Sequence, residues 1–129
     1  TSYENELIQV LMNIFINAKD ALANRKSEKL IIVVIKQIED NLVIKIKDNA
    51  GGVDSSIIDK IFEPYFTTKH QFNGTGIGLY MSKLIVEKHL IGEISVKNID
   101  FIFNSKTYRG ALFELVLPLN ITNKKETQS

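Results

Sequence analysis

Three groups of polar residues have types and spacings suited to chemistry. The first lies on an expected helix over residues 5–24, where Asn13, Asn17 and Asp20 succeed one another at intervals of four and three residues. At about 100° per residue, these side chains share a narrow polar stripe on an otherwise apolar helix. A solvated helix face is the ordinary explanation. This stripe is rich in amides, however, and an amide oxygen suits Mg²⁺ that is otherwise held by phosphates and water.

The second group is Asp48 with the glycine pair Gly51-Gly52, directly after a predicted strand. A turn closed by the aspartate side chain would explain this pattern, because Asp and Gly dominate turns. The functional alternative is a carboxylate at the bottom of a pocket. There it would accept a hydrogen bond from an exocyclic amine, while the glycines let a planar base approach the backbone.

The third group is Gly74, Gly76 and Gly78 at the expected start of a second long helix. Unpaired N–H groups and the helix dipole favour phosphate at such a position. The Rossmann fingerprint is excluded because no strand precedes the glycines and position 81 is Met, and the P-loop is excluded because the chain has no Gly-Lys pair. Alone, the triple glycine is a weak indication of phosphate binding.

Composition sets limits on the class of protein. The chain has 129 residues, 44% of them hydrophobic and 24% charged, which fits one globular domain. A net charge of +1 gives no support for nucleic-acid binding or direct membrane contact, and the absence of cysteine excludes disulfides and thiolate chemistry. Thr1 in place of an initiator Met, with no signal-peptide pattern after it, leads us to expect a cytoplasmic piece of a longer protein.

Helices and strands alternate in a way that brings these groups together. The stretch 62–75 has no periodicity and contains Pro64, so we expect a functional lid there. The insert 98–109 is expected to be a loop or a β-hairpin extension. The domain is expected over residues 1–119, and the polar tail 120–129 is expected to be disordered. Predicted strands cover residues 30–38, 42–47, 93–97 and 111–117, and predicted helices cover residues 5–24, 55–61 and 76–90.

The order of the motifs resembles the catalytic and ATP-binding domain of sensor histidine kinases, in the GHKL ATPase superfamily with its Bergerat fold. QVLMNIFINAKDAL resembles the N-box, DNAGGV the G1 box, IFEPYFTTK the F-box, GTGIGL the G2 box and GALFELVLP the closing strand. The resemblance implies an α/β (α+β) two-layer sandwich. In it, a mixed, mostly antiparallel β-sheet packs against three helices beside a mobile ATP lid.

The resemblance also implies roles for individual residues. Asn17 would be the Mg²⁺ ligand, with Asn13 beside it and Lys69 reaching a phosphate; these three would be the catalytic residues. Asp48 would accept from the adenine amine. Tyr65 is a weaker candidate in the lid. The residues implied to bind ATP are Asn17, Asp20, Asp48, Ala50, Gly52, Phe62, Phe66, Thr68, Lys69, Gly74, Thr75, Gly76, Ile77, Gly78 and Leu79.

Some residues depart from the family pattern. Ala50 stands where the G1 box usually has its first glycine, and it fits if it keeps a negative φ. Leu90-Ile91 stands where a glycine often follows the histidine of the second long helix. Asp20 replaces the Lys or Arg of many histidine kinases and is shared with a nitrogen-sensor-like subset.

Two absences bear on the reaction. Hydrolysing relatives carry Glu at the position of Asn13, and an amide cannot act as a general base. His70, in the lid, and His89, at a helix end, lie in no acceptor motif. We therefore expect an ATP-dependent histidine kinase domain whose partners are a separate dimerisation domain carrying the acceptor histidine and a downstream response-regulator receiver domain. The alternative is a nucleotide-gated interaction module of the same fold, such as a degenerate kinase or an anti-sigma-type regulator.

Overall fold

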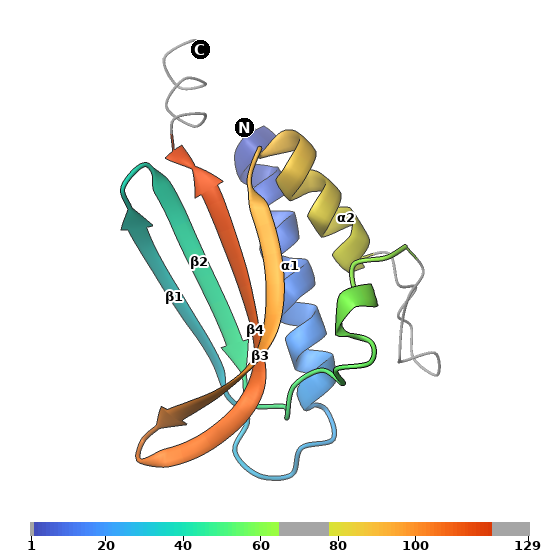
Figure 1. The fold of residues 1–129 in the computed structure, drawn as a ribbon, viewed down its shortest axis with the longest axis vertical. Coiled ribbons are helices and arrows are strands. Elements are labelled where there is room, and N and C mark those ends of the chain that lie inside the picture. Colours follow the sequence, from blue (N-terminus) through green and yellow to red (C-terminus); the bar gives the residue numbers. More distant parts are fainter. Residues whose placement is uncertain (1, 65–77, 120–129) are drawn as a thin grey trace.

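The computed structural model describes residues 2–64 and 78–119, drawn in colour in Figure 1. Two helical segments lie on one side of a β-sheet. The described elements, in chain order, are α1 (Ser2–Leu22), β1 (Ile31–Ile38), β2 (Asn41–Asp48), the 3₁₀ turn η1 (Ile58–Lys60), α2 (Gly78–Leu84), its π-helical continuation η2 (Ile85–His89), β3 (Glu93–Phe103) and β4 (Lys106–Pro118).

The described strands form a sheet in the order β1-β2-β4-β3, and every pairing in it is antiparallel. The expected antiparallel character is therefore confirmed. The parallel pairing that a mixed sheet would require does not occur among these strands. In the register, Ile44 of β2 lies between Ile35 of β1 and Leu115 of β4. Side chains alternate across a strand, so this register places the even-numbered residues of β2 on the face that the helices cover.

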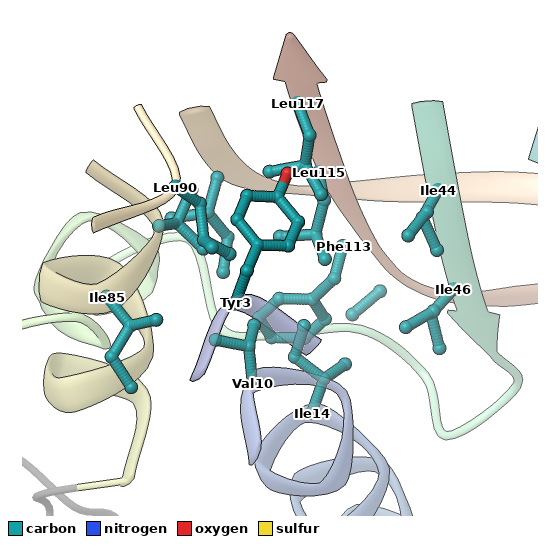
Figure 2. Packing of buried hydrophobic residues seen from close by; sticks show 13 residues of the cluster. Tyr3, Val10, Ile14, Ile44, Ile46, Ile85, Leu90, Phe113, Leu115 and Leu117 are labelled. Atoms are coloured by element: carbon teal, nitrogen blue, oxygen red, sulfur yellow. The ribbon is translucent and has the colours of Figure 1, made fainter. Parts of the chain in front are cut away.

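The core lies between the helices and this face of the sheet. Figure 2 shows Val10 and Ile14 of α1 pointing at Phe113, with Ile46 beside them, and Phe113 is 1% exposed. Each fully buried side chain of this kind stabilises the fold by about 1.5–3 kcal/mol. The helical spacing of Leu7, Leu11, Ile14, Phe15, Ala18 and Leu22 predicts a helix that is buried nearly all round apart from its polar stripe. Ile14, Ala18 and Leu22 are buried, but Ile8, Met12 and Ile16 are more than half exposed, so burial all round is wrong.

Strands β3 and β4 continue through the segment 98–109, so the hairpin alternative for this insert is confirmed. The two strands pair from Glu93 with Val116 to Phe103 with Lys106. Between them, Asn104 and Ser105 have φ angles of 51° and 65°. Two consecutive positive φ values are typical of the tight turns whose twist matches that of antiparallel strands.

Two of the predicted helices differ in detail from the structure. The short helix expected over residues 55–61 is reduced to η1, after Asp54 has turned the chain by accepting hydrogen bonds from the backbone N–H and hydroxyl of Ser56, both at 2.8 Å. The second long helix ends near the expected position. Its last turn is π-helical, with the Leu90 N–H donating to the Ile85 carbonyl at 2.9 Å.

After the helix, Ile91 has a left-handed backbone conformation, with φ at 55°. The Gly92 N–H then donates to the carbonyl of Val86 at 2.8 Å. This is the position usually taken by glycine after a helix, because a Cβ is disfavoured there. The departure noted at Leu90-Ile91 therefore leaves a β-branched residue in a strained backbone conformation.

The helical layer leaves the outer strand of the sheet uncovered. Ile31, Val33 and Ile35 of β1 are 38%, 41% and 61% exposed. On α1, Ile8, Met12 and Ile16 are each more than half exposed. Within residues 2–64 and 78–119, none of the helices has the length and apolar character that crossing a bilayer requires.

Candidate functional site

The polar stripe of α1 faces the start of α2. Asn13 Nδ2 donates to the Gly78 carbonyl at 3.2 Å and to Ser82 Oγ at 3.0 Å, and Ser82 Oγ in turn donates to the Gly78 carbonyl at 2.9 Å. Ser82 is fully buried. Asn13 therefore joins the two helices at the first turn of α2.

Asn17 and Asp20 lie further along the same stripe and are half-buried. Within the described parts of the chain, neither side chain has a hydrogen-bond or ion-pair partner. Asp20 also borders an open hollow of about 610 Å³, together with Leu22 and Ile31. The stripe thus leaves the Asn17 oxygen available to a ligand.

Asp48 ends β2 and is 3% exposed. Its Oδ1 accepts hydrogen bonds from the N–H groups of Ala50, at 3.0 Å, and Ala111, at 3.3 Å. Hydrogen bonds of this kind stabilise a carboxylate and fix its orientation. The expected turn around Asp48 is confirmed, and the carboxyl group is at the same time buried at the edge of the core.

Gly51 and Gly52 form the turn after Asp48, with φ angles of 98° and 92°. The Gly51 N–H donates to the Arg109 carbonyl at 2.9 Å. A Cβ on Gly51 would meet nothing within 4 Å, so there is open space beside the turn. Ala50 keeps a negative φ, as expected, and its methyl group causes no backbone strain.

Two asparagines that sequence reasoning did not select hold this turn in place. Asn49 is 1% exposed; its Nδ2 donates to the Glu28 carbonyl and its Oδ1 accepts from the Leu30 N–H, each at 2.9 Å. Asn98 of β3 bonds both backbone groups of Val53. At Asn98 the available signal was an asparagine that continues the alternation of Ile94 and Val96 beyond the predicted strand end at residue 97. At Asn49 the sequence gives no signal, because asparagine is common in turns whether or not its side chain is buried.

Phe62, expected to pack the lid, lies against the core. Its ring meets Phe113 edge to face, with centroids 6.2 Å apart. Lys83 Nζ lies 5.5 Å from the ring centroid of Phe62. Leu79 also packs on the core. The remaining expected lid and G2-box residues lie outside the described residues: Tyr65, Phe66, Thr68, Lys69, His70, Gly74, Thr75, Gly76 and Ile77.

The other titratable contacts have structural roles. His89 Nδ1 hydrogen-bonds with Glu6 Oε2 and thereby joins η2 to α1. The backbone N–H and hydroxyl of Ser56 lower the pKa of Asp54. The hydrogen bond from the Tyr108 hydroxyl to Glu28, at 2.5 Å, raises the pKa of Tyr108.

The donor set of the site fits a nucleotide with its metal. No group of three or more acidic, histidine or cysteine side chains able to hold a metal occurs among residues 2–64 and 78–119. Mg²⁺ that is held mainly by phosphate and water needs few protein ligands, and the amide oxygen of Asn17 fits that requirement. Asp48 and the open glycine turn fit the other end of such a ligand, an amine-bearing planar base.

Comparison with known proteins places this arrangement in a family. Residues 2–121 match the family described as histidine kinase-, DNA gyrase B- and HSP90-like ATPase. The chain belongs to this ATP-binding family, which confirms the resemblance drawn from the motifs.

Individual curated relatives of this chain are named histidine kinases. The chain is 40% identical over 118 residues to the signal transduction histidine-protein kinase AtoS of Escherichia coli K12, covering 91% of this chain and 17% of AtoS. It is 37% identical over 120 residues to the sensor histidine kinase ZraS of the same organism, covering 93% of this chain and 23% of ZraS. The chain thus spans about a fifth of the length of these relatives.

Among solved structures, the catalytic domain of histidine kinase ThkA superposes with a TM-score of 0.69 at 25% identity. The match covers 88% of this chain and 66% of that one. The two-layer sandwich is therefore shared with a histidine kinase catalytic domain.

Proposed function

We propose that this chain is the catalytic domain of a two-component sensor histidine kinase. It would bind Mg-ATP and transfer the γ-phosphoryl group to a histidine on a separate dimerisation domain of the same protein. A response-regulator receiver domain would then take the phosphoryl group from that histidine. We place the domain in the cytoplasm, where ATP is available.

The observation that carries this proposal is that the described residues offer two groups suited to the two ends of a nucleotide. Asp48 is buried and held by two backbone N–H groups beside an open glycine turn. Asn17 offers a half-buried amide oxygen on the polar stripe of α1. Together they suit the base and the metal-bound phosphates of one nucleotide, and the relatives' names favour kinase activity over a purely regulatory role.

The residues of this chain would act by positioning and by charge. Asp48 would accept the adenine amine, Gly52 would line the base pocket and Asn17 would provide one oxygen ligand. Mg²⁺, when bound, would reduce the negative charge of the phosphates. Lys69 and the backbone N–H groups near Gly76 and Gly78 would donate to phosphate oxygens. Such preorganised donors are the main catalytic resource in phosphoryl transfer.

Asn13 favours transfer over hydrolysis. An amide has no lone pair that titrates near neutral pH, so it cannot take a proton from water. Its Nδ2 is also used by Gly78 and Ser82, and Asn13 therefore holds the start of α2 in place. In transfer, the bond from the γ-phosphorus to its bridging oxygen would break, a bond to the acceptor imidazole nitrogen would form, and ADP would leave.

Radiolabelled Mg-ATP tests the proposal. Incubated alone, the chain should bind nucleotide, hydrolyse it slowly and acquire no label. Joined to the acceptor domain of its own full-length protein, it should label that domain's histidine, more efficiently than when the two are mixed, because a linker supplies an effective concentration on the order of millimolar. Nucleotide binding without any transfer would favour the regulatory alternative. Rapid turnover by the isolated chain, or label on His70 or His89, would contradict the proposal.

A further inference from the structure

The glycine turn after Asp48 needs an external support to hold one shape. Gly51 and Gly52 both have positive φ angles, and glycine has the widest choice of backbone conformations of any residue. Two such residues in succession impose little order on the chain. A defined pocket therefore depends on what fixes the two ends of the turn.

Asn98 fixes the far end. Its Oδ1 accepts the N–H of Val53 at 2.7 Å, and its Nδ2 donates to the carbonyl of Val53 at 2.6 Å. One carboxamide thus satisfies both backbone groups of the residue that follows the turn. A Cβ on Gly52 would lie 2.7 Å from Asn98 Oδ1, so the amide also packs directly against the turn.

The other end of the glycine turn, at Asp48, is held by the residue that pairs with Asn98 in the sheet. Asn98 pairs with Ala111 across β3 and β4, and the Ala111 N–H donates to Asp48 Oδ1 at 3.3 Å. Directly opposed residues of an antiparallel pair have Cα atoms about 4.5–5.5 Å apart. The carboxyl group of Asp48 and the backbone of Val53 are consequently held by one cross-strand pair.

We propose that Asn98 is a positioning residue for nucleotide recognition. It keeps the Gly51-Gly52 turn at a fixed separation from Asp48, and it thereby sets the pocket that receives the base. This inference rests on the proposed function, because it assumes that the base lies between Asp48 and the turn. It adds a residue outside the five motifs that carry the family resemblance to those that determine affinity.

Calorimetric titration with ADP and Mg²⁺ tests the inference on three forms of the chain. Asn98→Ala should weaken ADP binding about ten-fold or more, the equivalent of losing a single hydrogen bond or two. Lys97→Ala is the matched control, because Lys97 is exposed on the neighbouring position of β3 and should leave the Kd unchanged. Asn98→Asp keeps the acceptor for the Val53 N–H but loses the donor to its carbonyl, so it should also weaken binding.

Urea unfolding of each variant separates positioning from a general loss of structure. A reversibly unfolded fraction raises the apparent Kd only by the reciprocal of the folded fraction, whereas a displaced turn raises the Kd of a sample that is fully folded. If Asn98→Ala does not fold, Asn98→Asp supplies the same comparison.

The inference is overturned if the variants bind ADP with the wild-type Kd. Failure of the wild-type chain itself to bind ADP would overturn the proposed function and this inference together. Binding by the wild type with no change in the variants would overturn this inference alone.

Discussion

Gly110 of β4 and Asp48 of β2 are in contact through their backbones. A Cβ at position 110 would lie 1.6 Å from the Asp48 carbonyl oxygen and 2.9 Å from Oδ1. Only glycine therefore allows β4 to pass the end of β2 closely enough for Ala111 to bond the carboxyl group.

Gly110→Ala should displace Asp48 and destabilise the fold by about 3 kcal/mol, at the upper end of the cost of overpacking. Gly51→Ala is the control, because its Cβ would enter open space and its cost is confined to the positive φ, about 1–2 kcal/mol. Urea unfolding of both variants measures the difference. Equal destabilisation would show that the contact at Gly110 relaxes without cost.

Asp48→Asn should abolish selective ATP binding while the chain stays folded. The amide oxygen can still accept from Ala50 and Ala111, but the charged acceptor for the adenine amine is lost. In the wild type, ATP should bind about 10- to 100-fold more tightly than GTP, because guanine presents a carbonyl oxygen to the carboxylate. Calorimetry with both nucleotides checks this, and similar affinities for ATP and GTP would contradict the role of Asp48.

Asn17→Ala should reduce the affinity for ATP only when Mg²⁺ is present, because it removes one metal ligand and leaves the base end intact. Titrations with Mg²⁺ and with EDTA make the comparison. Gln9→Ala, an exposed change on the same helix stripe, is the control and should alter neither affinity. An equal loss with and without metal would show that Asn17 has a structural role.

Ile91→Gly should stabilise the protein. The left-handed conformation costs a β-branched residue about 1–2 kcal/mol, and the side chain is 53% exposed, so little burial is lost. Glycine removes this strain but adds an entropic cost, so only part of the roughly 1–2 kcal/mol is gained. Ile91→Asn should behave similarly. A rise in Tm of a few degrees by calorimetric scanning is expected. Ile91→Val keeps the strain, and a rise of equal size in that variant would exclude backbone strain as the cause.

Tyr108→Phe should change how stability depends on pH in the alkaline range. The hydrogen bond to Glu28 raises the pKa of Tyr108 above its ordinary value of about 10, so the folded state holds this proton more tightly than the unfolded state. The corresponding stability is complete below pH 10 and is lost as the pH rises through the folded pKa. Urea unfolding at pH 8 and above pH 10 should show a smaller decline in Tyr108→Phe, and parallel declines would contradict this.

Local patterns predicted the elements well, whereas contacts between distant segments could not be predicted from them. The spacing of Leu7, Leu11, Ile14, Phe15, Ala18 and Leu22 predicted the apolar face of α1, where Ile14, Ala18 and Leu22 are buried, and the Ile/Val-rich stretches located β1 and β2. Asp48 and its glycine turn were found because strand, acid and glycines are adjacent in sequence. Asn98 and Gly110 act on that turn from 45 and more residues away, through the register of β3 and β4. The hydrophobic periodicity within each strand does not determine which residues of β3 and β4 pair.

The reduction of the expected helix at 55–61 to a 3₁₀ turn has a local cause that the sequence only half reveals. The sequence Asp54-Ser55-Ser56 predicts a helix N-cap. In the structure the bonds from Ser56 to Asp54 instead form a tight turn two residues on, and η1 has no side-chain cap. Aspartate and serine favour such turns as readily as helix starts. Which outcome occurs depends on the packing of the following residues, Ile57 and Ile58, and that packing is a tertiary property.

Because η2 is π-helical, the helix should tolerate the loss of one residue better than the gain of one. Ser82 anchors one end through Asn13, and Gly92 anchors the other, where a Cβ would lie 2.4 Å from the Val116 carbonyl. Between these anchors, hydrogen bonding from residue 90 to residue 85 accommodates one residue more than an α-helical turn would. Deleting exposed Lys88 would let the turn return to α-helical geometry with both anchors in place, whereas an added residue has no comparable turn to enter. Gaps in aligned relatives are therefore expected at residues 85–89 more often than insertions.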